Sequence, residues 1–90
     1  MSKLANLDID DIILLTKNSN LYSISQVDKI INSKVIRLTD LKRFLNNDWD
    51  PCWYFHTDVE SEIAITFLFK PDPSIPIHQQ IQHLYPELSL

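Results

Sequence analysis

The 90-residue chain contains no glycine, and this absence limits both the turns and the sites that it can form. Glycine takes positive backbone φ angles at little cost, and it lets a backbone approach a phosphate group closely. Phosphate-binding loops and dinucleotide-binding folds depend on these properties. The sequence therefore argues against nucleotide-binding enzymes of those kinds. It also predicts turns built from Asn, Asp, Ser and Pro, which cluster in segments 18–20, 32–33, 46–48, 50–51 and 72–73.

Two runs rich in aromatic and β-branched residues dominate the second half of the chain. They cover residues 52–57 and 63–70, with a polar, acidic segment between them. Such residues pack best on the pleated surface of a sheet. The second run alternates, so that its odd-numbered residues share one predicted face. We predict a central antiparallel hairpin over 52–70 that brings together four aromatic side chains: Trp53, Phe55, Phe67 and Phe69.

Residues 8–17 are compatible with two structures. Three aspartates ahead of an apolar run suit the start of a helix. Residues 12–15, however, are apolar on every side, which suits a short buried strand better than a surface helix. We favour a strand that turns at 18–20 and returns antiparallel over 21–24.

Short helices are predicted at three places. Residues 24–31 have apolar side chains at helical spacing and contain a sequence similar to a capping box. After a strand over 35–38, a second helix starts at Thr39, with Leu41, Phe44 and Leu45 facing inward. A third covers residues 76–85 and ends before Pro86. Its inward-facing residues are Ile77, Ile81, Leu84 and Tyr85.

The expected fold class is α+β, in one small domain that covers residues 1–90. It has an antiparallel sheet of about five short strands, with two or three short helices packed on one face. A composition of 44% hydrophobic and 22% charged residues suits such a domain. One cysteine allows no internal disulfide, and no apolar run approaches the roughly 20 residues that cross a bilayer. We expect a cytoplasmic protein that does not bind membranes.

The charge is unevenly distributed along the chain. The net charge is −4, but segment 29–43 carries +4, so the remainder carries −8. A net acidic protein disfavours non-specific binding to nucleic acid. The basic segment nevertheless offers an alternative function as a nucleic-acid-binding domain through five residues: Lys29, Lys34, Arg37, Lys42 and Arg43. We favour the interpretation that these side chains form solvated faces.

The loop around Trp49 is the strongest candidate for recognition. A tryptophan between two aspartates suits contact with a basic protein, because Trp is enriched at binding hot spots. The alternative is that Trp49 folds back as a lid over the predicted hairpin. The acidic segment 58–62 either extends the binding surface or keeps the hairpin soluble. The candidate partner-binding residues are Asp48, Trp49, Asp50, Asp58, Glu60 and Glu62.

Side chains that bind metals are few and poorly spaced. Residues 8–11 hold three aspartates, but a calcium loop needs more oxygen ligands and a glycine. The soft ligands are Cys52, His56, His78 and His83, and they lack the spacing of a zinc site. Acids near Cys52 disfavour a reactive thiolate. We predict no metal, no cofactor and no catalytic residue.

These patterns favour a small non-catalytic protein-interaction module of the inhibitor, immunity-protein or accessory-subunit type. Its partner is another protein, more basic than itself, and electrostatic attraction would accelerate their association. A homodimer formed through an exposed strand edge is compatible with this function.

Overall fold

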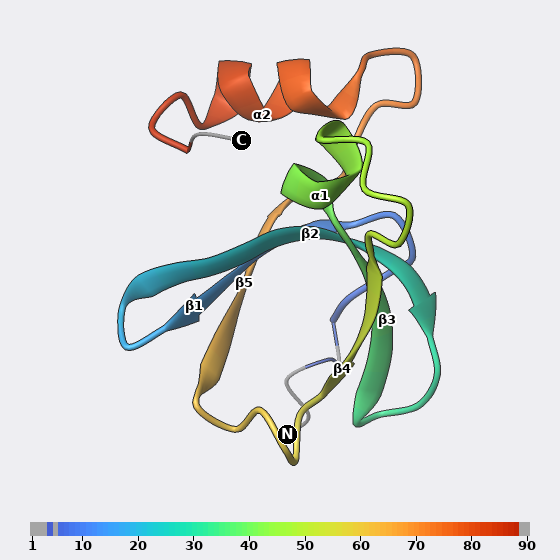
Figure 1. Cartoon of the computed structure of the whole chain (residues 1–90), viewed down its shortest axis with the longest axis vertical. Coiled ribbons are helices and arrows are strands. Elements are labelled where there is room, and N and C mark those ends of the chain that lie inside the picture. Colours follow the sequence, from blue (N-terminus) through green and yellow to red (C-terminus); the bar gives the residue numbers. More distant parts are fainter. Residues whose placement is uncertain (1–3, 5, 89–90) are drawn as a thin grey trace.

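The protein is a five-stranded antiparallel sheet with two helices, seen in a computed structural model that describes residues 4 and 6–88. The elements are β1 (Ile12–Lys17), β2 (Asn20–Ile30), β3 (Val35–Asp40), α1 (Leu41–Leu45), β4 (Cys52–His56), β5 (Ile63–Phe69) and α2 (Ile77–Leu84). The order across the sheet is β4-β3-β2-β1-β5, and all neighbours are antiparallel (Figure 1). The predicted α+β class with a five-stranded antiparallel sheet is confirmed.

The predicted hairpin over 52–70 is wrong, although both of its arms form strands. β4 pairs with β3, and β5 pairs with β1, so these two strands lie at opposite edges of the sheet. The reason lies in β1, whose first four residues are apolar. Such a strand needs a neighbour at each edge and packing on each face. β5 therefore pairs with the edge of β1 that β2 leaves free.

The β1–β2 hairpin confirms the strand interpretation of the N-terminal region. The two strands pair as far as Lys17 opposite Asn20. The turn between them consists of Asn18 and Ser19, with φ angles of 52° and 65°. Positive φ at both central residues is the geometry of a type I′ turn, whose twist matches that of its strands. Asn and Ser thus supply the backbone conformation that glycine usually provides.

The helix predicted over 24–31 is wrong, because β2 continues through these residues to Ile30. β2 pairs with β1 along one edge and with β3 along the other. Its side chains alternate, so that Ile24 and Val27 belong to clusters on opposite faces. Pairing at both edges satisfies the backbone of an eleven-residue strand. That tertiary context outweighs the local helix signal.

The predicted alternation along β5 breaks near its end. Phe69 lies opposite Ile12 and Phe67 lies opposite Ile13, so Leu68 is an extra residue in a β-bulge. Both Leu68 and Phe69 then pack against the cluster beneath the helices. Phe67 remains half exposed. A bulge redirects the side chains that follow it, and period-two reasoning cannot anticipate it.

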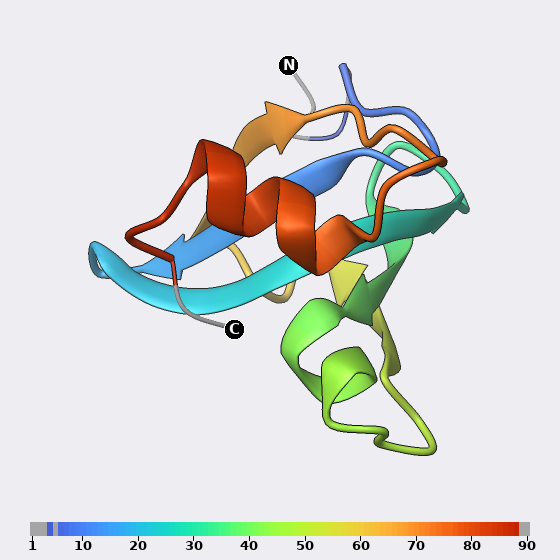
Figure 2. The ribbon, with the colours of Figure 1, turned by 90° about the horizontal axis from the view of Figure 1, so that it is seen from above.

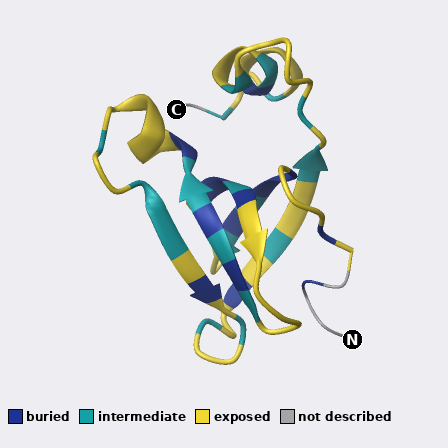
Figure 3. Cartoon of the chain, turned by 90° about the vertical axis from the view of Figure 1, so that its right-hand side faces the viewer, coloured by how far each residue is buried: buried dark blue, intermediate teal, exposed yellow. Residues whose placement is uncertain are grey.

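Apolar side chains pack on both faces of the sheet, and buried residues recur along its strands (Figure 3). The inner cluster consists of Leu4, Leu7, Ile13, Leu15, Val27, Ile36, Leu38, Phe55 and Ile63. The outer cluster consists of Ile12, Ile24, Leu41 and Ile81, with Leu14, Leu68, Phe69, Ile77 and Leu88 packed against it. Leu41 and Ile81 come from α1 and α2, so both helices contribute to the outer cluster. Leu4 and Leu7 bring the N-terminal segment into the inner one.

α1 begins two residues after its predicted start. The Asp40 side chain caps it by accepting a hydrogen bond from the backbone N–H of Arg43, at 3.0 Å. Leu41 is buried, as predicted. Phe44 and Leu45 are exposed, which corrects the prediction that they face inward.

α2 follows its predicted range to within one residue at each end. Ile81 is its one buried side chain. Beyond the helix, the Tyr85 ring stacks on Phe69 with centroids 6.2 Å apart, and its hydroxyl donates to the Leu68 carbonyl at 3.0 Å. Leu84, predicted to face inward, is exposed. Within residues 4 and 6–88, no helix is both long enough and apolar enough to cross a bilayer.

A buried carboxylate joins the N-terminal segment to the end of β5. The Asp11 side chain is only 2% exposed, and its Oδ1 lies 2.9 Å from Lys70 Nζ. Lys70 also contacts Asp8 Oδ2 at 2.8 Å, and the Asp8 backbone N–H donates to Asp11 Oδ2 at 2.9 Å. Hydrogen bonds to Asp8 and Asp11 raise the pKa of Lys70 above its ordinary value of 10.5.

Replacing Lys70 by Met is expected to lower the free energy of unfolding, because it leaves the buried Asp11 carboxylate without a cation. K70M combined with Asp11→Asn should recover part of the loss, since an amide needs no counter-ion. A lysine whose pKa is raised on folding contributes its full stabilisation at pH values below 10.5, its ordinary pKa. This contribution is lost as the pH rises through the pKa of the folded state. Denaturant unfolding at about pH 7 and about pH 11 measures both effects.

The matched control is Lys42→Met, which removes an exposed lysine that forms no ion pair within the described part of the chain. Equal stability of K70M and K42M at neutral pH would contradict the role given to Lys70.

Replacing Ser19 by Gly is expected to stabilise the protein by about 0.5 kcal/mol. Glycine relieves roughly 1–2 kcal/mol of left-handed strain, which exceeds its entropic cost of about 0.5–1 kcal/mol. Ser19→Ala keeps the Cβ atom and should give no gain. Denaturant midpoints compare the variants, and an S19G protein less stable than S19A would refute the explanation.

Candidate functional site

Trp49 projects from the loop between α1 and β4 into solvent. It is 92% exposed, the largest exposed fraction among the large apolar residues that the structure describes. This exposure excludes the alternative in which Trp49 folds back as a lid. Viewed from above, α1 and the loop over 46–51 stand away from the sheet (Figure 2). A partner can therefore reach the whole indole ring without moving the fold.

Hydrogen bonds within the loop hold Trp49 in this position. Asp48 Oδ1 accepts the backbone N–H of Asp50 at 3.0 Å, and Asp48 Oδ2 lies 3.4 Å from Arg43 Nε. These contacts form a turn with Trp49 at its tip. At the base, the Asp40 N–H donates to the Pro51 carbonyl at 2.8 Å. The loop is ordered before any partner arrives, which lowers the entropic cost of binding.

The loop begins at a helix end that would ordinarily use glycine. Asn47 follows α1 with a φ angle of 59°, and its N–H donates to the Phe44 carbonyl at 3.2 Å. The Asp48 N–H donates to the Arg43 carbonyl at 3.0 Å. A left-handed Asn after the last turn satisfies helical carbonyls and turns the chain sharply. The polar segment 46–48 thus directs the chain toward Trp49.

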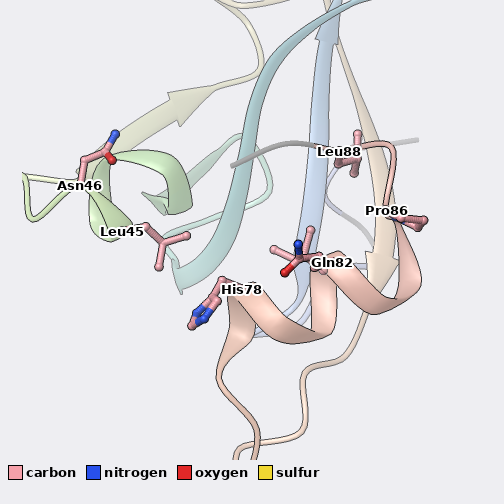
Figure 4. Close-up of a pocket in the computed structure, with 7 residues that line it drawn as sticks. Leu45, Asn46, His78, Gln82, Pro86 and Leu88 are labelled. Atoms are coloured by element: carbon pink, nitrogen blue, oxygen red, sulfur yellow. The ribbon is translucent and has the colours of Figure 1, made fainter.

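A groove lies between α1 and α2, beside this loop. One part has a volume of about 290 Å³ and is lined by Gln26, Thr39, Leu41, Phe44, Leu45, Pro76, Ile77 and His78. The adjoining part has a volume of about 460 Å³ and is lined by Leu45, Asn46, His78, Ile81, Gln82, Pro86 and Leu88. Leu45 and His78 belong to both parts and lie across the groove from one another (Figure 4). We call this feature the α1–α2 groove.

Sequence reasoning missed the groove because it placed Phe44 and Leu45 in the core. The helical period shows that the two residues can pack with Leu41, but it does not show whether another element covers them. Here α2 leaves Phe44 largely exposed and Leu45 half exposed. Three large apolar side chains, Phe44, Leu45 and Trp49, thus lie exposed within six residues. Their number in a short exposed helix and loop is the signal that could have identified the site.

The second group of predicted acidic residues lies elsewhere. Asp58, Glu60 and Glu62 occupy the connection between β4 and β5, at the far end of β4 from the Trp49 loop (Figure 1). Five strand residues separate the two loops by about 17 Å. Asp58 lies 3.5 Å from Lys34, and Glu62 lies 3.6 Å from Lys17. The structure therefore brings Asp48 and Asp50 together with Trp49 but leaves the other three acids apart.

The basic residues of segment 29–43 do not form one continuous surface. Lys29 and Arg37 are cross-strand neighbours on β2 and β3. Lys34 lies in the turn before β3, whereas Lys42 and Arg43 lie on α1, which follows the other end of β3. Three of the five are paired with acids. Arg37 lies 3.1 Å from Asp28. Lys34 is paired with Asp58, and Arg43 is paired with Asp48.

The candidate metal ligands are dispersed. Asp8 and Asp11 are engaged with Lys70. Cys52 lies beside Thr39, with its sulfur 3.6 Å from the Thr39 hydroxyl oxygen. Among residues 4 and 6–88, no three His, Cys, Asp or Glu side chains gather closely enough to hold a metal ion.

The connection from β5 to α2 positions one wall of the groove. The Gln80 side-chain amide donates to the carbonyls of Asp72 and Ile75, each at 2.8 Å, and its oxygen accepts the Asp72 N–H at 2.9 Å. Asp72 Oδ1 in turn accepts the Ser74 hydroxyl at 2.7 Å and the Ser74 N–H at 2.9 Å. These two hydrogen bonds, the hydroxyl first, lower the pKa of Asp72 below its ordinary value of 3.8.

Comparisons with protein-family models, curated proteins and solved structures find no match for this chain. Its function is therefore argued from its own residues.

Ser74→Ala is expected to raise the pKa of Asp72 toward 3.8, because it removes the hydroxyl hydrogen bond, which lowers this pKa more than the backbone hydrogen bond does. A carboxylate whose pKa is lowered on folding stabilises the fold at pH values above its ordinary pKa. This stabilisation is lost as the pH falls through the pKa of the folded state. The variant should therefore be less stable than wild type at neutral pH, with a smaller difference in acid. Carboxyl-detected NMR titration of Asp72 measures the shift, and an unchanged pKa in S74A would contradict the assignment.

Proposed function

We propose that this protein is a small, non-catalytic protein-interaction module that binds a more basic protein through the loop around Trp49. The observation that carries the proposal is the 92% exposure of Trp49 on a hydrogen-bonded loop. A buried tryptophan would contribute to folding, whereas an exposed and ordered one contributes little to stability. Tryptophan in such a position is characteristic of binding hot spots.

Charge supports a basic partner. Asp48 and Asp50 flank Trp49, and the chain carries a net charge of −4. Acidic surfaces attract basic partners and accelerate their association. Asp58 and Glu62, at the other end of β4, are paired with Lys34 and Lys17, so Glu60 is the member of that group that extends the negative field.

The α1–α2 groove supports a contact larger than one side chain. It lies next to the Trp49 loop, and its smaller part is lined mainly by apolar side chains, among them Leu41, Leu45 and Ile77. A partner segment with apolar residues can occupy it while its basic residues face Asp48 and Asp50. Apolar pockets surrounded by polar groups are common features of recognition sites.

The nucleic-acid alternative has less support. Neutralising phosphates requires several unpaired basic side chains on one surface, and Lys34, Arg37 and Arg43 each have an acidic neighbour. A reducing compartment such as the cytoplasm suits a protein with a single cysteine, which here is unpaired.

Trp49→Ala is expected to weaken partner binding at least tenfold, as is usual for a tryptophan hot spot. Its effect on folding should stay within about 0.5 kcal/mol, because the side chain lies in solvent. The test is quantitative capture of proteins from host extract on wild-type and variant protein, with thermal unfolding measured in parallel.

Tyr54→Ala provides the matched control. Tyr54 is also an exposed aromatic residue, 57% exposed, but it lies on β4 outside the Trp49 loop. Captured proteins should be basic, should bind wild type and Y54A alike, and should be lost from W49A. If W49A captures the same proteins in the same amounts, or unfolds much earlier than wild type, this site is wrong.

A further inference from the structure

A second cavity lies on the inner side of the sheet, where β3 leads into α1. It has a volume of about 310 Å³ and is lined by Tyr22, Ser23, Asp40, Arg43 and Trp53. Trp53 comes from β4 and Tyr22 from β2, so the cavity lies across strands that are far apart in the sequence. Arg43 connects it to the Trp49 loop through its contact with Asp48. We call this feature the mouth pocket.

The Asp40 carboxylate is held in a fixed orientation inside the mouth pocket. Its Oδ2 accepts the Ser23 hydroxyl at 2.9 Å, and its Oδ1 accepts the Arg43 backbone N–H at 3.0 Å. Ser23 is buried and is itself 2.7 Å from the hydroxyl of the buried Ser25. The carboxylate is therefore preorganised by neutral donors on two sides.

Among the residues that the structure describes, Asp40 has no cationic partner. None of the ion pairs within the described ranges includes it, and the side chain of Arg43 contacts Asp48 instead. A partly buried carboxylate gains most from a cation that approaches inside its pocket, because water screens the pair less there. The mouth pocket thus holds a fixed negative charge on Asp40 beside the positive charge of Arg43, whose Nε is engaged with Asp48.

Two aromatic rings form the remaining wall. The Tyr22 and Trp53 rings lie 6.1 Å apart and are tilted by 49°. Tyr22 has no residue opposite it on β1, because Leu15 pairs with Ser23 and Thr16 with Leu21, so a β-bulge places it here. Indole and phenol faces attract cations, and Trp does so most strongly.

We propose that the mouth pocket receives the side chain of a lysine or arginine from the basic partner. The cationic group pairs with Asp40, and its aliphatic stem lies against Trp53 and Tyr22. This inference rests on the proposed function, since it assigns one basic residue of the same partner to a specific pocket. The Trp49 loop and the mouth pocket, joined by the Arg43–Asp48 contact, then form one recognition surface.

The test uses N-acetyl-argininamide as the probe and N-acetyl-citrullinamide as its uncharged counterpart. The chain has two tryptophans, so W49A identifies the remaining indole N–H signal in the NMR spectrum as that of Trp53. The arginine compound should shift the Trp53 signal with a dissociation constant on the order of 1–10 mM. The citrulline compound should bind at least about fivefold more weakly, because it lacks the charge.

Asp40→Asn is the decisive variant. Asparagine caps helices as well as aspartate does, so α1 should persist while the charge is removed. D40N should weaken binding of the arginine compound about fivefold or more. Glu87→Gln, which removes an exposed charge outside the pocket and outside the Trp49 loop, should change it little. Equal binding of both compounds to wild type, or unchanged binding of the arginine compound to D40N, would overturn the assignment.

The same variant separates this inference from the proposed function. Proteins that wild type captures and W49A does not should also bind D40N about fivefold more weakly or worse. If they bind D40N as they bind wild type, the pocket takes free cations only and the inference fails, although the Trp49 site stands. If W49A keeps its partners, the proposed function fails whatever the argininamide titration shows.

Discussion

The structure depends on β1, a strand that is apolar on both of its faces. Ile13 and Leu15 belong to the inner cluster, and Ile12 belongs to the outer one. A strand of this kind is stable only when it has neighbours at both edges and side chains against both faces. β2 and β5 pair with its edges, α2 packs toward its outer face, and the N-terminal segment contributes to its inner side (Figure 1). The places of β2, β5, α2 and the N-terminal segment follow from meeting these requirements.

The residues proposed for recognition lie apart from those that stabilise the fold. Strands β1, β2 and β3 supply most of the buried side chains, whereas Trp49 and the residues around it lie on a short helix and a loop outside the sheet. Loops positioned by a rigid scaffold commonly carry binding residues. Asp40 links the two parts, because it ends β3, caps α1 and lines the mouth pocket. A substitution there can alter binding without altering the core, provided that the cap is kept.

The positions of four of the five strands could be predicted from the sequence, but among the strand pairings only that of β1 with β2 was. β-branched and aromatic content identified the strands that became β1, β3, β4 and β5, because it reflects what each segment tolerates locally. Pairing depends on which edges remain uncovered, and this is a property of the whole sheet. The prediction joined β4 to β5 because their separation is short, whereas the exposed edge of β1 determined the outcome.

The candidate site was only partly predictable for a similar reason. The composition around Trp49 suggested recognition, and the exposure of this residue agrees with that interpretation. The α1–α2 groove and the mouth pocket, in contrast, arise where residues distant in sequence meet. Tyr22 reaches Trp53 only because a bulge displaces it, and no local pattern signals that bulge.

The attachment of α2 has a consequence for the motions of the molecule. Ile81 is the single buried side chain of the helix, Ile77 is only partly buried against the outer cluster, and a hydrogen-bonded turn holds the segment before them. Regions held by few buried groups open without unfolding the rest of a domain. Amide hydrogens of α2 should therefore exchange with solvent well before those of β1 and β2. Each such opening would uncover Ile12 and Ile24. We therefore expect α2 to be a mobile wall of the α1–α2 groove.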